Sequence, residues 1–112
     1  MVTTTLIVDG MIAGTGIRDA VEGGYLEAAK VGISAELAKT LSEWHAEYAA
    51  ASRESFSDPD AVAELDQKGL AIRSQIADEL PDQIVGYYSD AICKRLDDLP
   101  HVRSTRSWRE DR

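Results

Sequence analysis

The sequence predicts an α+β fold in which a small antiparallel sheet packs on an antiparallel helical hairpin, with short flanking helices. Residues 34–55 carry large apolar side chains at spacings of four, three and four, which form one stripe along a helix. Residues 59–80 repeat this helical spacing. Residues 3–8 and 83–89 are rich in β-branched and aromatic side chains, which favour strands.

The first strand, residues 3–8, is predicted to belong to a β-hairpin. Asp9-Gly10 follows it, and this pair favours a tight type I′ turn because both central positions of that turn need positive φ. The returning strand is therefore expected at residues 11–13.

A glycine turn at residues 14–16 should end the returning strand. Thr15 is expected to cap a short helix over residues 17–22. Residues 26–31 predict a second short helical turn, and Ser34 is placed to cap the long helix that follows.

The long helix has two distinct apolar sides. Its large side chains should face the core: Leu37, Leu41, Trp44 and Tyr48. A second side carries small residues: Ala35, Ala38, Ser42, Ala46 and Ala49. Small residues permit close approach of another backbone, so this second side could receive the other helix, the sheet or another copy of the chain.

The second helix should begin with Asp58 as its N-cap and end before Pro81. Gly69 lies within its apolar stripe, where glycine costs about 1 kcal/mol relative to alanine. A close helix crossing under Trp44 or Tyr48 would explain it.

The C-terminal part is expected to add a third strand over residues 83–89, paired with the hairpin, and a short helix over residues 91–99. Residues 1–100 are predicted to form one domain. Residues 101–112 form an Arg-containing tail with little apolar content, for which we expect mobility, although Trp108 could dock it.

The charge of the chain is strongly negative, at −8 with a pI near 4.6. Residues 1–100 contain eight Lys and Arg against eighteen Asp and Glu, whereas the tail contains four against two. Nucleic-acid affinity comes mainly from clustered Lys and Arg, so direct nucleic-acid binding is not expected. A basic protein partner fits this charge, as does simple solubility.

The single cysteine, Cys93, excludes an internal disulfide and favours a reducing compartment. The N-terminal apolar run stops at Val8, too early for a signal peptide or a membrane span. We therefore expect a soluble, cytoplasmic protein without a membrane partner.

The first candidate site is an anion-binding loop that places a glycine turn beside a cation: Gly14, Thr15, Gly16 and Arg18. Free backbone N–H groups at such a turn can hold a phosphate or carboxylate. Neither a P-loop nor a dinucleotide-binding motif is present. The alternative is that the glycines only turn the chain.

The second candidate is a set of carboxylates around the ends of the predicted sheet: Asp9, Asp19, Glu22 and Asp90. Such a set could perform acid/base chemistry or hold Mg²⁺, but turns and caps also favour Asp. His45 is interpreted as a residue at the core margin and Cys93 as a small buried residue. No metal site, cofactor or catalytic residue is predicted.

The third candidate is an acidic ridge on the long helix, formed by four glutamates: Glu36, Glu43, Glu47 and Glu54. They fall within about ±20° of one another over roughly 27 Å of helix axis. A solvated helix face is the simplest interpretation, and the functional one is a surface that meets a basic partner.

These observations favour a small acidic, non-enzymatic protein-binding domain that inhibits or neutralises a basic partner, of the immunity, antitoxin-like or anti-defence type. One alternative is a small anion- or nucleotide-binding domain, or an enzyme, that uses the loop from Gly14 to Arg18. Another is a homodimeric structural module that associates through its alanine face or an exposed strand edge.

Overall fold

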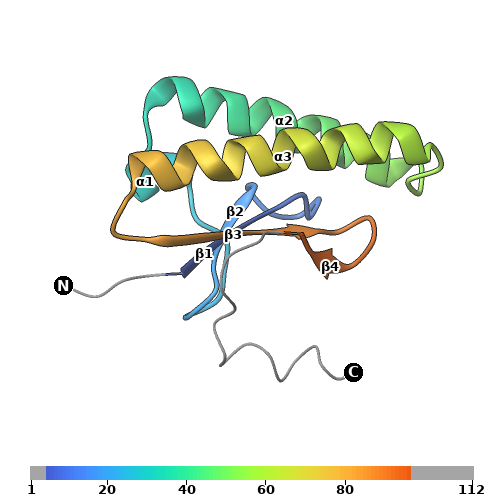
Figure 1. Ribbon diagram of the computed structural model, residues 1–112. Coiled ribbons are helices and arrows are strands. Elements are labelled where there is room, and N and C mark those ends of the chain that lie inside the picture. The colour runs from blue at the N-terminus through green and yellow to red at the C-terminus, as the bar shows by residue number, and fades with distance from the viewer. Residues whose placement is uncertain (1–4, 97–112) are drawn as a thin grey trace.

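The computed structural model describes residues 5–96, which form a four-stranded mixed sheet with two long helices on one face (Figure 1). The strands are β1 (Thr5–Asp9), β2 (Ile17–Asp19), β3 (Ile84–Ser89) and β4 (Lys94–Arg95). Their order across the sheet is β2-β1-β3-β4. The α+β class predicted from the sequence is confirmed.

The central strands β1 and β3 are parallel, with a register from Thr5 opposite Ile84 to Asp9 opposite Tyr88. The other two pairs are antiparallel. The prediction of an antiparallel sheet is therefore wrong in its central pair. The helical hairpin between β1 and β3 returns the chain to the end of the sheet where β1 began, so β3 runs in the same direction.

The partner of β1 in its hairpin is β2 rather than residues 11–13, and the helix predicted over residues 17–22 is absent. Ile17 pairs with Val8 and is fully buried, whereas Met11 and Ile12 remain exposed. Burying Ile17 in the core outweighs the tight turn suggested by Asp9-Gly10. Gly10 does not adopt positive φ; it leaves room for the ring of Tyr48.

The three helices are α1 (Ala28–Val31), α2 (Ala35–Arg53) and α3 (Pro59–Glu79). Ser34 caps α2 by accepting a hydrogen bond from the N–H of Leu37, and Asp58 caps α3, as predicted. The Ser34 N–H and hydroxyl donate to the Glu79 carboxylate at 2.6 and 2.8 Å. The start of α2 therefore meets the end of α3, and the two helices run in opposite directions.

The core lies between the helices and the sheet, and all four residues of the large apolar stripe of α2 are buried in it. The indole N–H of Trp44 donates to the carbonyl of Leu65 at 2.8 Å, which ties α2 to α3. Gly69 does permit a close approach, but the ring that covers it is Tyr87 from β3 rather than Trp44 or Tyr48.

The small-residue face of α2 is mostly open to solvent. Ala35, Ser42 and Ala46 are exposed, Ala38 is half-buried, and Ala49 is buried. A tight helix crossing along this whole face is therefore absent from the part of the chain that the structure describes.

The helix predicted over residues 91–99 is replaced by a turn and β4 up to residue 96, and its remainder lies outside the described residues. The predicted tail, residues 101–112 with Trp108, also lies outside them. Within residues 5–96, no helix is both long enough and apolar enough to cross a membrane.

Candidate functional site

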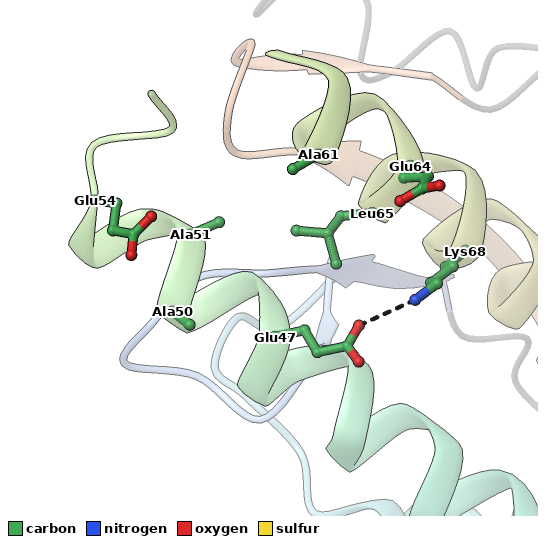
Figure 2. Close-up of a pocket in the computed structure, with 8 residues that line it drawn as sticks. All are labelled: Glu47, Ala50, Ala51, Glu54, Ala61, Glu64, Leu65 and Lys68. Carbon is green, nitrogen blue, oxygen red and sulfur yellow. Dashed lines mark hydrogen bonds and ion pairs between the residues drawn. The ribbon is translucent and has the colours of Figure 1, made fainter. Parts of the chain in front are cut away.

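A groove of about 330 Å³ lies between the C-terminal half of α2 and the N-terminal half of α3 (Figure 2). Its floor is apolar: Ala50, Ala51, Ala61 and Leu65. Its charged rim consists of Glu47, Glu54, Glu64 and Lys68. We call this hollow the acidic groove.

The rim of the acidic groove has more negative than positive charge, because three carboxylates accompany one ammonium group. The Lys68 Nζ lies 3.3 Å from Glu47 Oε1, but both side chains are more than half exposed, so this ion pair contributes little. Within residues 5–96, neither Glu54 nor Glu64 forms an ion pair. The groove is therefore a net acidic surface with an apolar base, in which Glu54 and Glu64 have no cationic partner among residues 5–96.

Glu54 adds to this effect through its position at the C-cap of α2. The C-terminus of a helix carries partial negative charge from its unsatisfied carbonyl groups, so a carboxylate there is repelled by about 0.3–1 kcal/mol. A cation bound at this end of the groove would relieve that repulsion as well as pair with the carboxylate.

The structure places three of the four ridge residues along the line where α2 meets α3. Glu47 and Glu54 line the acidic groove, and Glu43 lines an adjoining hollow that shares Glu47. Glu43 is 3.8 Å from Lys39 across an exposed helical turn. Glu36 lies in the first turn of α2 and lines neither hollow.

Sequence reasoning missed the α3 side of the acidic groove, which supplies Glu64 and Lys68. The two residues are four apart and flank buried Leu65 on α3. That spacing marks them as neighbours on one helix face. Only the alignment of the two helices shows that this face meets Glu47.

The predicted anion-binding loop is engaged in internal contacts. Arg18 Nε donates to Asp9 Oδ2 at 2.7 Å, and the Thr15 hydroxyl donates to the carbonyl of Leu26. Residues 17–19 form a strand, so the helix N-terminus on which the prediction depended does not follow Gly16. Anion binding at this loop stays a prediction, but it lacks the support of a helix N-terminus.

Asp9 is the residue that organises this end of the sheet. It is 2% exposed and accepts hydrogen bonds from Arg18, from the Met11 N–H at 3.2 Å and from the Tyr25 hydroxyl at 2.9 and 3.0 Å. Burial and the adjacent Asp9 carboxylate raise the pKa of the Tyr25 phenol. These contacts connect β1 with β2 and the segment after it.

The structure divides the predicted carboxylate set between two ends of the sheet. Asp90 follows β3 near Asp9, and burial together with the Asp9 charge raises the pKa of Asp90 to about 6. Asp19 lies opposite Leu6 because β2 is antiparallel to β1, and its Oδ1 accepts the N–H groups of Val21 and Glu22.

Across residues 5–96, no group of three or more His, Cys, Asp and Glu side chains is arranged to hold a metal ion. His45 lies at the margin of the core as predicted, and its Nε2 donates to the Met11 carbonyl at 2.7 Å. The prediction that Cys93 is buried is wrong. Cys93 is exposed on the turn between β3 and β4, where its φ is 57°.

No family model, curated protein or solved structure matches this chain. The geometry of its surfaces is therefore the basis for a functional proposal.

Proposed function

We propose that this chain is a small, non-enzymatic protein-binding domain that inhibits or neutralises a basic partner protein, of the immunity, antitoxin-like or anti-defence type. The observation that carries the proposal is the acidic groove, in which Glu47, Glu54 and Glu64 surround an apolar floor. An ordinary solvated helix face would carry the same charges but would not form a groove with an apolar floor.

The groove fits the side chain of an arginine or lysine from the partner. The aliphatic stem of such a side chain packs on apolar surface while its charged head stays at a polar rim. Here the floor of Ala50, Ala51 and Leu65 would contact the stem, and Glu54 and Glu64 would bind the head. Arginine is favoured because its planar guanidinium donates to carboxylates in a bidentate manner.

Glu47 can exchange Lys68 for a cation of the partner with little loss of stability. Their 3.3 Å contact is solvent-exposed, so replacing Lys68 with a cation of the partner sacrifices little stability. The net charge of −8 would also accelerate encounter with a basic surface at low salt.

The first experiment is affinity purification of the tagged chain from its native cell, followed by identification of the bound protein. The affinity of the purified pair is then measured for a triple charge reversal in the acidic groove: Glu47→Lys, Glu54→Lys and Glu64→Lys. We expect the dissociation constant to rise by at least about a hundredfold, because buried interfacial charge pairs contribute several kcal/mol.

A matched control reverses three exposed acids elsewhere and so produces the same change in net charge: Glu22→Lys, Glu27→Lys and Asp82→Lys. Loss of long-range attraction alone would slow association equally in both variants. The proposal requires faster dissociation in the groove variant only. Equal affinities of the two variants, with both folded by circular dichroism, would exclude the acidic groove as the binding surface.

A further inference from the structure

A second hollow, of about 360 Å³, lies where the loop between α2 and α3 approaches the turn between β3 and β4. Both connections lie at the same end of the molecule (Figure 1). Phe56, Val62, Ile92 and Leu96 give the hollow a largely apolar lining, and Asp66 of α3 also lines it. We call it the Asp66 hollow. Its volume is within the range of small-molecule sites.

Asp66 is 5% exposed, and three hydroxyl groups from other elements converge on its carboxylate. The Tyr48 and Tyr87 hydroxyls donate to Oδ1 at 3.0 and 2.6 Å, and the Ser89 hydroxyl donates to Oδ2 at 2.8 Å. Every one of these bonds uses a neutral donor. The hydroxyl groups hold the carboxylate in one orientation without neutralising its charge.

The Asp66 carboxylate therefore has hydrogen-bond partners but no partner of opposite charge among residues 5–96. Within residues 5–96, no Lys, Arg or His side chain forms an ion pair with it. A carboxylate offers about four acceptor positions, and three are used here, which leaves one on Oδ2. Buried charges are ordinarily paired because an isolated buried charge is costly. A cationic donor that entered the hollow would supply both the missing charge and the fourth hydrogen bond.

We propose that the Asp66 hollow is a binding site for a small organic cation, an amine or amidine attached to an apolar body. The N–H of the cation donates to Oδ2 of Asp66, and the apolar body packs against Phe56, Val62 and Leu96. Ile92, which is 51% exposed at the lining, loses solvent contact when the site is filled. This site is separate from the acidic groove and does not depend on a protein partner.

The chemistry of the site disfavours other small-molecule classes. An ionised carboxylate only accepts hydrogen bonds, so an anionic ligand meets repulsion from Asp66. A neutral apolar molecule fills the lining but leaves the charge unpaired. An inorganic cation supplies charge but gains nothing from the apolar surface.

The test uses three ligands of similar shape: 2-phenylethylamine, 2-phenylethanol and 3-phenylpropanoate. Each is titrated into the ¹⁵N-labelled full-length chain and followed by amide chemical shifts. We expect saturable shifts centred on Val62, Ala91 and Ile92 with the amine. The alcohol should bind about ten- to a hundredfold more weakly, as expected for loss of a charge-assisted hydrogen bond, and the carboxylate should not bind.

Two variants separate charge recognition from the shape of the hollow. Asp66→Asn should weaken the amine about tenfold or more and leave the alcohol nearly unchanged. Ala63→Trp should block both ligands, because Ala63 is an exposed residue of the lining and its replacement leaves the hydroxyl network intact. Asp78→Asn is the matched control, since Asp78 is an exposed acid of the same helix that lines neither the Asp66 hollow nor the acidic groove, and it should leave both affinities unchanged.

Equal affinity for the amine and the alcohol would overturn the proposal, as would shifts centred on Glu47 and Glu54 or an absence of saturable binding. If Asp66→Asn does not fold, the ratio of amine to alcohol affinity in the native chain and the effect of Ala63→Trp decide the question. The proposed protein partner should still bind the Ala63→Trp variant, so failure of one proposal is distinguishable from failure of the other.

Discussion

Replacing Gly69 by alanine should have two opposing effects on the stability of the protein, one from helix propensity and one from packing. Alanine in the middle of α3 should stabilise the helix by about 1 kcal/mol. A Cβ at this position, however, would lie 2.7 Å from Cζ and from the hydroxyl oxygen of Tyr87, far inside van der Waals contact. The two effects have opposite signs, so the stability of Gly69→Ala measures which one prevails.

The Tyr87 ring cannot easily move away from the added methyl group. The residue is fully buried, and its hydroxyl donates to Asp66 at 2.6 Å. Overpacking a core usually costs about 1–3 kcal/mol, and a ring held at both ends should be near the upper value. After the helix-propensity gain is subtracted, we expect Gly69→Ala to lower the free energy of unfolding by about 1–2 kcal/mol.

Urea denaturation, monitored by circular dichroism, measures this change in the free energy of unfolding. An unchanged m-value would show that the substitution does not alter the compactness of the folded and unfolded states. Ala71→Gly calibrates helix propensity on the same helix, because Ala71 is exposed. In a Tyr87→Leu background the clash is removed, so Gly69→Ala should become stabilising, which gives a coupling energy of about 2–3 kcal/mol. If Gly69→Ala stabilised the native chain by about 1 kcal/mol, the packing explanation would be wrong.

Three further outcomes are expected. Burial raises the pKa of Asp90 in the folded state from 3.8 to about 6, so the folded state loses stability as pH rises through this range and Asp90 ionises. Asp90→Asn should therefore raise the free energy of unfolding by about 1–2 kcal/mol at pH 7.5 and leave it unchanged at pH 3. The exposed Asp82→Asn control should show no such pH dependence. Ser34→Ala removes the α2 cap and should cost about 1 kcal/mol in urea melts, whereas exposed Ser42→Ala should change stability by less than about 0.5 kcal/mol. Cys93 should react with a thiol reagent in the native protein at nearly its unfolded rate, and strong protection would contradict its exposed position.

The two long helices were predictable because their signals are local. The stripe from Leu37 to Tyr48 repeats every three or four residues, and Ser34 and Asp58 cap the helices next to them in sequence. The prediction of a helix over residues 17–22 was wrong, because a short stretch with Ile17 at its head is compatible with either a helix or a strand. The pairing of Ile17 with Val8 makes this segment a strand, and that contact depends on closure of the loop formed by residues 9–16.

The candidate site was predictable on one helix only. Helical geometry aligns Glu43, Glu47 and Glu54, and the structure places all three along the line where the two long helices meet. The groove itself depends on how far α2 is shifted along α3, which brings Glu47 to Lys68. No local pattern encodes that alignment.

The sequence by itself determined the α+β class, the two long helices with their caps and buried stripe, and the acidic charge of the chain. These properties follow from residue chemistry and from spacings within a few turns of one helix. The tertiary structure decided the parallel pairing of β1 with β3 and the acidic groove. It also assembled the hydroxyl network around Asp66, whose partners lie 18 to 23 residues away in the chain. These features are contacts between distant segments, so they exist only once the helical hairpin has folded onto the sheet.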